Sequence, residues 1–292
     1  MNIKQTSIFF LSFFCFAAVF FASSLAVKEN REDLGANYSL QINPLPGKII
    51  PLLAGEFKGL LADHILLEIG AFVGSNKKIS ADEEQKIYLG MEQAMILDPY
   101  FMQTYLFTQA LLSWDCKMPE EAIRLLEISR KHLPWDWRPG YYIGFDYYYF
   151  LNDYAKASEI FLETAKIKNS PLLIALLGSR FALKSKKTET AIILLTNMLK
   201  DPELSENNRE SISKRIKDLK GVLLIESALK TYKKTFNTYP SSLNALVQKG
   251  FLKKLPLNSY YKTYLYRQED GQVFFDKTGY KQISDQGTSI NK

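Results

Sequence analysis

The stretch that best defines the fold is YYIGFDYYYFLNDYAKASEIF, residues 141–161. It places the small residue Gly144 thirteen positions before Ala157, and the bulky Phe161 follows four positions later. The flanking segments repeat this layout with Gln109, Ala122 and Leu126, and with Gly178, Ala191 and Leu195. The three alanines lie 35 and 34 residues apart, the period of a two-helix unit that buries its apolar face against its neighbours. The sequence therefore predicts a mainly α fold made of antiparallel helix pairs.

Residues 81–202 resemble tetratricopeptide repeats. That family places a large apolar residue early in the first helix, a small residue in its middle, and an alanine followed by an aromatic residue or leucine in the second helix. The matching residues are Tyr105, then Ile143, Gly144, Tyr147, Ala157 and Phe161, then Leu177, Gly178, Phe181, Ala191 and Leu195. Two departures are Gln109 at a small-residue position and one extra residue between the helices of each unit. The resemblance implies a tetratricopeptide-repeat-like (TPR-like) α-solenoid over residues 51–203, with an atypical first helix pair.

Two further segments follow the predicted repeats. Residues 204–237 carry apolar residues at helical spacing and are expected to form a capping helix. Residues 238–281 are expected to form a small α+β cap, because the apolar runs around Glu269-Asp270-Gly271 are typical of a β-hairpin with Asp-Gly at its turn. The last residues, 282–292, are predicted to be a disordered tail.

The C-terminal cap resembles the C-terminal portion of type II secretion pseudopilins. The shared pattern is Y-P-x-x-L at Tyr239 followed by G-x-L-x-x-L-P at Gly250. Where those relatives have an aspartate-proline pair and glycine, this chain has Leu257-Asn258-Ser259-Tyr260. The resemblance implies an alternative function as a structural subunit or assembly factor of an envelope, pilus or secretion complex.

The N-terminal residues 1–27 contain twenty almost wholly apolar residues from Ile8 to Val27. This is about the length that crosses a hydrocarbon core of ~30 Å as a helix. Two interpretations stay open, an uncleaved signal-anchor and a signal peptide cleaved after Ser24-Leu25-Ala26. Residues 28–50 would then be an extended linker. The expected localisation is a single-pass membrane protein with its bulk extracytoplasmic (periplasmic), or a secreted or periplasmic protein after cleavage.

Charge is distributed unevenly along the chain. The net charge is +6, and the residues from Lys200 onward include 17 basic and 10 acidic side chains. Such an excess is typical either of a surface that meets an anionic partner or of a solvated helix surface. We expect no nucleic-acid partner.

Catalytic motifs are absent from the sequence. It has no phosphate-binding glycine loop, no G-x-S-x-G and no H-E-x-x-H, and its only histidines are His64 and His132. The two cysteines, Cys15 and Cys116, cannot build a disulfide framework or a cysteine zinc site. Cys116 is interpreted as an exposed bystander or a packed loop residue. We therefore expect no enzymatic activity, no cofactor and no metal.

The candidate site is the groove that the tetratricopeptide resemblance implies. Its inner wall is built by residues three before and one after each small residue, and Arg138 and Tyr148 extend it along the most aromatic helix. The expected partner-binding residues are Arg138, Tyr141, Phe145, Tyr148, Leu106, Ala175 and Ser179. Lysine and asparagine, which clamp a terminal carboxylate in some family members, are missing there. Aromatic residues in a groove are typical anchors for a peptide, and the alternative is an aromatic-rich core.

These observations predict a non-catalytic, membrane-tethered extracytoplasmic scaffold. Its partners would be a protein or peptide in the groove, the membrane through the N-terminal helix, and an anionic surface at the basic last third.

Overall fold

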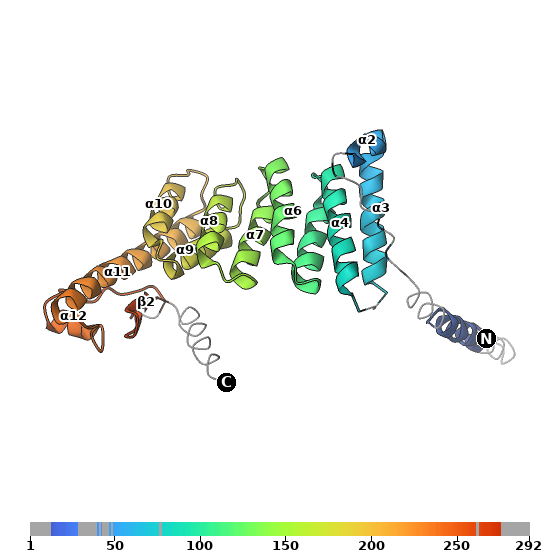
Figure 1. Ribbon diagram of the computed structural model, residues 1–292. Helices are drawn as coiled ribbons and strands as arrows, with labels where there is room; N and C mark the ends of the chain where they lie inside the picture. The colour runs from blue at the N-terminus through green and yellow to red at the C-terminus, as the bar shows by residue number, and fades with distance from the viewer. Residues whose placement is uncertain are drawn as a thin grey trace, which may run out of the picture. The chain divides into compact units, whose positions relative to one another are not determined.

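The computed structural model describes residues 13–28, 40, 42, 47, 49–75, 78–260 and 263–275. The chain divides into two compact units, residues 1–132 and residues 133–292. The described residues are mainly helical, with a small two-stranded antiparallel sheet near the C-terminus (Figure 1). This confirms the mainly α class and the C-terminal hairpin. The predicted tail, 282–292, and most of the predicted linker lie outside the described residues.

The N-terminal segment corrects one prediction. Residues 13–28 are described there, and they are helical. Within the described ranges, no helix has both the length and the apolar character that a membrane crossing requires. This finding contradicts the membrane anchor and the single-pass localisation predicted from this segment.

The first unit is a row of helices. They are α2 (Ile50–Ala54), the 3-10 turn η1 (Gly55–Phe57), α3 (Lys58–Val73), α4 (Ala81–Leu97), α5 (Met102–Phe107), the π-helical η2 (Thr108–Asp115) and α6 (Pro119–His132). Helix α4 begins at a capping box, in which the Ser80 backbone N–H donates to the Glu83 carboxylate at 2.9 Å. Helix α3 packs on α4, because Gly90 leaves room for Ile69: a Cβ at position 90 would lie 3.0 Å from Ile69 Cδ1.

The π-helical stretch contains the position where the repeat pattern has glutamine in place of a small residue. Gln109 is buried there, and the Thr108 hydroxyl donates to the Thr104 carbonyl oxygen at 2.8 Å. Helix α6 packs against η2 and α4, with the Ser129 hydroxyl 2.9 Å from Met95 Sδ. The large residue of this first predicted repeat, Tyr105, is fully buried as the pattern requires.

The second unit contains the other two predicted repeats, the long helix and the cap. Its elements are α7 (Trp137–Tyr149), α8 (Tyr154–Thr164), α9 (Leu172–Lys184), α10 (Thr188–Met198), α11 (Glu206–Phe236), α12 (Asn244–Gln248), β1 (Leu265–Arg267) and β2 (Gln272–Phe274). Side-chain caps begin three of the helices: Asp136 accepts from the Arg138 backbone N–H, Asp153 from that of Lys156, and Ser205 from that of Asn208. Figure 1 shows α7 to α10 as neighbouring rods followed by α11.

Close helix contact explains the small residues of the repeat pattern. A Cβ at Gly144 would lie 3.0 Å from the Phe161 ring, and one at Gly178 would lie 2.8 Å from Leu162 Cδ2. The alanines Ala157 and Ala191 are fully buried. The pairs α7–α8 and α8–α9 therefore approach each other where the sequence removes side-chain volume.

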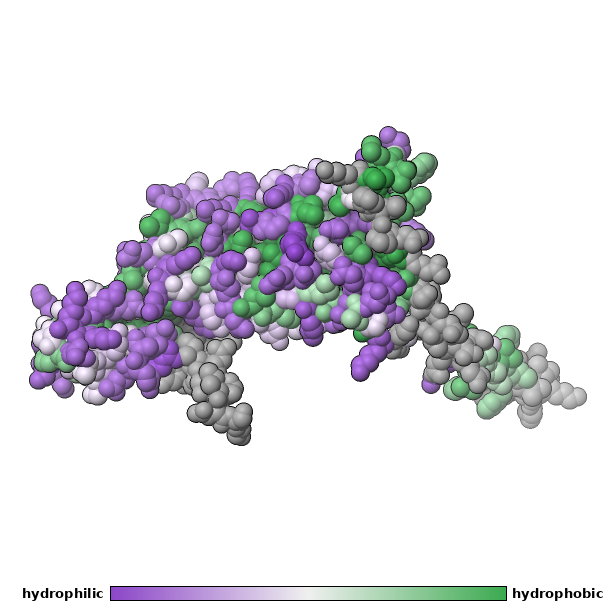
Figure 2. All heavy atoms as spheres, viewed as in Figure 1, coloured by the Kyte–Doolittle hydropathy of each residue, from purple (hydrophilic) through white to green (hydrophobic). Residues whose placement is uncertain are grey.

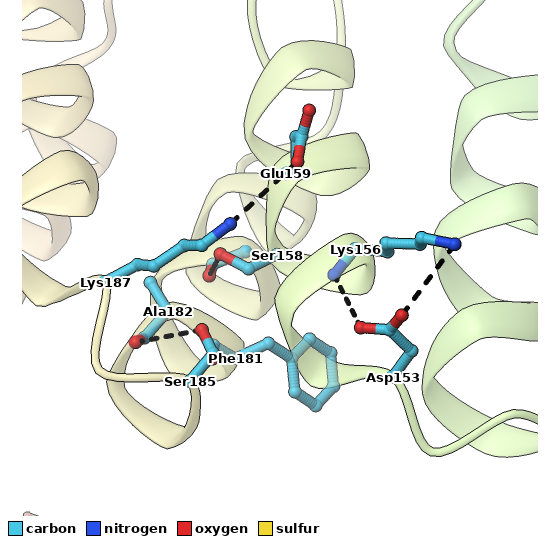
Figure 3. A network of polar contacts seen from close by, with 9 residues as sticks. Asp153, Lys156, Ser158, Glu159, Phe181, Ala182, Ser185 and Lys187 are labelled. Carbon is cyan, nitrogen blue, oxygen red and sulfur yellow. Dashed lines mark hydrogen bonds and ion pairs between the residues drawn. The ribbon is translucent and has the colours of Figure 1, made fainter.

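Polar contacts also tie α8 to α9 and to the turn that follows α9 (Figure 3). The Ser158 hydroxyl donates to the Gly178 carbonyl oxygen at 2.9 Å, so it is satisfied although it is buried. Ser185 donates back to the Phe181 carbonyl oxygen at 2.9 Å, and Lys187 Nζ lies 4.0 Å from Glu159 Oε2. The first and third contacts join α8 to α9 and its following turn, and the Ser185 hydroxyl adds a second donor to a carbonyl oxygen in the last turn of α9.

The cap shares its core with α11. The strands pair antiparallel with Tyr266 opposite Val273, and Gly271 turns the hairpin at φ 71° beside the Tyr239 ring. Tyr264 donates to the Asp218 carbonyl oxygen of α11 at 3.1 Å. The hairpin therefore packs on the long helix, in one core cluster with α9 and α10.

The close contact at Gly178 predicts a measurable loss of stability. Gly178→Val inserts branched volume against the Leu162 side chain and backbone, and overpacking of this kind costs about 1–3 kcal/mol. The urea-unfolding midpoint of the second unit should fall accordingly. Ser213→Val, at an exposed position of α11, introduces the same side chain without a clash. It should change the free energy of unfolding by no more than about 0.5 kcal/mol and move the midpoint correspondingly little. Equal midpoints for the two variants would contradict the packing described.

Candidate partner-binding surface

Helix α7 carries most of the predicted site, and its first turn is held by one buried carboxylate. Asp136 Oδ1 accepts from the Arg138 backbone N–H at 3.0 Å and from Arg138 Nε at 2.8 Å. The Arg138 side chain thus lies at the helix entrance, as predicted, and is paired with Asp136. Pro139 follows in the first turn, where its missing N–H costs no helical hydrogen bond.

The aromatic residues of α7 form a continuous ring network with α8 and α9. Tyr141 lies 6.0 Å from Phe161 between ring centroids, and Tyr148 lies 4.5 Å from Phe181. Phe145 stacks on Tyr149 at 5.3 Å with an interplanar angle of 15°. Tyr141, Phe145 and Tyr148 are half-buried, so each ring packs on the core through one side and keeps part of its surface accessible.

The remaining predicted site residues have different environments. Ala175 and Ser179 on α9 are fully buried, and the Ser179 hydroxyl donates to the Leu176 carbonyl oxygen at 2.8 Å. Neither side chain is accessible to a partner in this structure. Leu106 belongs to the first unit, where it is half-buried on α5. Of the seven predicted residues, the structure brings together Tyr141, Phe145 and Tyr148 beside Arg138.

Several residues at this surface escaped the sequence analysis. Tyr154, the first residue of α8, stacks on Phe181 at 6.0 Å, and Lys184 Nζ lies 4.3 Å from the centre of the Tyr154 ring. Lys156 Nζ lies 5.0 Å above Tyr147. An ammonium group over an aromatic face is a favourable electrostatic contact. The sequence shows that these residues lie near helix ends, but it does not predict that Tyr154 pairs with Lys184. That pairing depends on how α8 packs against α9.

We name the half-exposed ring network the α7 aromatic surface; it comprises Tyr141, Phe145, Tyr148, Tyr149 and Tyr154. Burial raises the pKa of the neighbouring Tyr142 hydroxyl, with a smaller contribution from Tyr141. A phenol whose pKa is raised stays neutral at physiological pH and acts there as a hydrogen-bonding group. The surface therefore offers apolar ring faces and phenol hydroxyls, with the Lys184 ammonium group at its edge over Tyr154.

A second polar cluster joins α11 to the cap. Asp218 Oδ1 accepts from the Ser259 backbone N–H at 2.8 Å and from its hydroxyl at 3.0 Å. Arg215 Nη2 donates to the Tyr260 hydroxyl at 2.9 Å, and its guanidinium group lies 4.8 Å from the Phe275 ring. Burial raises the pKa of Asp218, and the Ser259 bonds and the charge of Arg215 oppose this only in part. These contacts hold the loop before the hairpin against α11.

Two of the clefts in the described part of the second unit are large enough to consider for chemistry. One of about 970 Å³ is lined by α10 and by the connections before α9 and α11, and includes Ser170, Asn197 and Leu204. The other, of about 400 Å³, lies between the α9–α10 turn, α11 and the hairpin and includes Lys186 and Glu226. Burial raises the pKa of Glu226, while Lys230 and Lys186 act in the opposite direction. Neither set of lining residues combines a nucleophile with an adjacent histidine base.

The other residues considered for chemistry are isolated from one another. Cys116 is buried, and burial together with Glu84 and Asp115 raises the pKa of its thiol to about 12. The His132 ring lies 5.6 Å from the Tyr100 ring, and its Nδ1 lies 2.8 Å from the Ile128 carbonyl oxygen. Across the described part of the chain, no group of three histidine, cysteine or acidic residues could hold a metal ion. Cys116 is therefore a packed residue, which is one of the two interpretations that the sequence left open.

Comparisons with protein-family models, curated proteins and solved structures found no match to this chain. The tetratricopeptide and pseudopilin resemblances and the anionic partner of the basic last third therefore stay predictions.

The thiol environments predict selective alkylation. Native protein treated with iodoacetamide at pH 8 should be modified at the exposed Cys15, while Cys116 should react at least ~100-fold more slowly because little thiolate forms at a raised pKa. Peptide mass spectrometry after timed quenching measures both sites. In urea the two rates should converge. Rapid native labelling of Cys116 would contradict its burial.

The Asp218 carboxyl predicts a specific pH dependence of stability. Its pKa is raised in the folded chain, so folding favours the protonated form, and the resulting stabilisation is present at low pH and lost as pH rises through the folded pKa. Asp218→Asn keeps an acceptor for Ser259 but does not titrate. We therefore compare the free energy of unfolding of the native chain with that of this variant. The difference, native minus variant, should decrease as pH rises above 3.8, the ordinary pKa of an aspartate carboxyl. Exposed Glu269→Gln serves as the control, and a difference that grows with pH would contradict this assignment.

Proposed function

We propose that this protein is a non-catalytic scaffold with TPR-like helix pairs, which binds a peptide or protein segment on the α7 aromatic surface. The observation that carries the proposal is the row of half-exposed rings on Tyr141, Phe145 and Tyr148. The packing of these rings on Phe161 and Phe181 supports it, because anchors that are already ordered lose little conformational freedom on binding.

The TPR-like part of the proposal is supported by a repeated backbone feature. The turns that separate the two helices of each predicted repeat contain Lys117, Asn152 and Lys186, all with positive φ (57°, 53° and 60°). These residues are spaced at the same 35- and 34-residue intervals as the alanines. A left-handed backbone in a residue other than glycine is uncommon. Its recurrence at one position favours three equivalent helical hairpins.

The chemistry of the surface indicates the kind of segment it fits. Aromatic rings contribute about 1.5–3 kcal/mol each when a partner fully buries them, and they dominate the energetics of many interfaces. Tyrosine hydroxyls can bond to the backbone of an extended segment, and the Lys184 ammonium group over Tyr154 favours an acidic side chain at the edge of the segment. We infer that the partner segment carries apolar anchor residues flanked by aspartate or glutamate.

A peptide selection on the full-length chain tests this proposal. Displayed twelve-residue peptides should be enriched for apolar anchors with acidic flanks, and binding of a selected peptide should change the fluorescence of Trp137, whose ring lies 6.2 Å from Tyr141. Phe145→Leu/Tyr148→Leu keeps apolar volume in the core but removes the ring faces. We expect the dissociation constant to rise at least ~10-fold, which corresponds to about 1.4 kcal/mol.

Tyr100→Leu is the matched control, because Tyr100 is an exposed ring in the first unit and its replacement should leave the dissociation constant unchanged. Urea midpoints of all variants show whether the second unit stays folded. Unchanged peptide affinity in the folded double variant would overturn the assignment of this surface.

The alternative function, a structural subunit or assembly factor of an envelope, pilus or secretion complex, stays a prediction from the cap resemblance. The cap buries Tyr264, Val273 and Phe275 in the core that it shares with α11. These residues therefore stabilise the second unit, and their burial gives no independent support for docking.

A further inference from the structure

Helix α3 of the first unit is apolar on two opposite faces. One face is buried and packs on α4; it comprises Ala62, Ile65, Leu66, Ile69 and Phe72. The other face is exposed; it comprises Phe57 at the N-cap, Leu60, His64, Leu67 and Ala71, and we name it the α3 stripe. A helix face that carries several large apolar side chains is normally covered by another element. Among the described residues of this unit, only the first of the two faces is covered.

The exposure of the α3 stripe is large. Phe57, Leu60 and Leu67 keep 70%, 68% and 73% of their surface accessible, and the exposed Leu52 and Leu53 precede them on α2. Figure 2 shows hydrophobic surface gathered over α2 and the adjoining end of α3. Scattered exposed leucines are ordinary on a protein surface, but a contiguous set of this kind is typical of an interaction site.

The spacing of the stripe indicates a helical partner. Its residues follow one another at intervals of three, four, three and four, which is the alternation that lets one helix pack along another at a shallow angle. Leu60 and Leu67 are seven residues apart, at the heptad position where leucine commonly fills the seam between paired helices. The stripe covers two heptads, so it fits a short helix pair rather than a long coiled coil.

The shape of the stripe is self-complementary. The bulky Phe57 is at one end, whereas Ala71 and Gly70 are at the other, and nothing lies within 4 Å of a Cβ placed on Gly70. In an antiparallel pair of identical helices, the Phe57 ring of each copy falls beside the small residues of the other. A two-fold axis requires this kind of match, because the same patch must fit itself.

The area is sufficient for a dimer. Five large apolar side chains are exposed here, those of Leu52, Leu53, Phe57, Leu60 and Leu67. If each buries on the order of 120 Å², a symmetric pair removes ~1,200 Å², which is the lower end for specific interfaces. We propose that the α3 stripe, together with Leu52 and Leu53, is the interface through which two copies of this chain associate as an antiparallel helix pair.

Charges beside the stripe give the dimer a diagnostic salt dependence. Asp63 lies one residue from the centre of the stripe, so in the antiparallel pair the Asp63 carboxylates of the two copies face each other beside the two-fold axis. Salt screens this repulsion and should tighten self-association. A basic partner helix on the same stripe would instead bind more weakly as the salt concentration rises.

Sedimentation velocity of the full-length chain between 0.05 and 0.5 M salt, at about 5–50 µM protein, tests the proposal; at these concentrations complexes with micromolar dissociation constants are populated. We expect a reversible dimer whose dissociation constant decreases with salt. Leu60→Lys/Leu67→Lys should be monomeric with unchanged circular dichroism, because both side chains are exposed. The matched control, Leu173→Lys/Ile193→Lys, replaces two exposed apolar residues of the second unit and should dimerise normally.

A cross-link tests the antiparallel geometry separately. In a Cys15→Ser background, Asp63→Cys places a thiol beside the predicted two-fold axis, and mild oxidation should link the dimer. A monomeric native chain, an association that survives Leu60→Lys/Leu67→Lys, or binding of a monomer to phosphatidylcholine vesicles through these leucines would each overturn the proposal. Failure of the cross-link in a dimer that the lysine variant abolishes would overturn its antiparallel form.

Discussion

The close approach of neighbouring helices is the constraint on which the rest of the structure depends. A helix of eleven to seventeen residues has little stability alone and must bury one face against another element. In the second unit that burial requires glycine at positions 144 and 178, since the Phe161 ring and the Leu162 side chain occupy the space that a Cβ would need. The ring network of α7 follows from the same geometry, because α8 and α9 bring Phe161 and Phe181 under it.

One set of side chains therefore takes part in both stability and the proposed recognition. Tyr148 contacts Phe181 in the core and keeps an accessible side, and Arg138 is aligned by the carboxylate that caps its helix. A surface built in this way is rigid in its shape and adaptable only at its edge, where Lys184 lies over a ring. Substitutions that test recognition must therefore preserve volume, since removing a ring also opens a cavity.

Much of the fold could be predicted from local chemistry. The alanine interval and the Asp-Gly turn depend on short-range sequence, and the helices and hairpin occur where these signals predict them. The site was predicted less completely. Helical spacing states which face a residue occupies but does not state what covers that face, and Ala175 and Ser179 are buried for that reason. The membrane anchor was predicted from the apolar composition of residues 8–27, whereas no helix among the described residues combines the length and apolar character of a span.

The π-helical turn from Thr108 to Asp115 has a consequence for how this repeat can vary. An α-helix rotates by about 100° with each residue, so a single insertion normally turns every later side chain away from its partner. A π turn contains more residues per turn than an α-helix. It can therefore accommodate one additional residue as a local bulge, without rotating the side chains that follow. Tyr105 and Ala122 both stay buried on either side of this turn. The first repeat can thus tolerate a change in length that would misalign a regular helix.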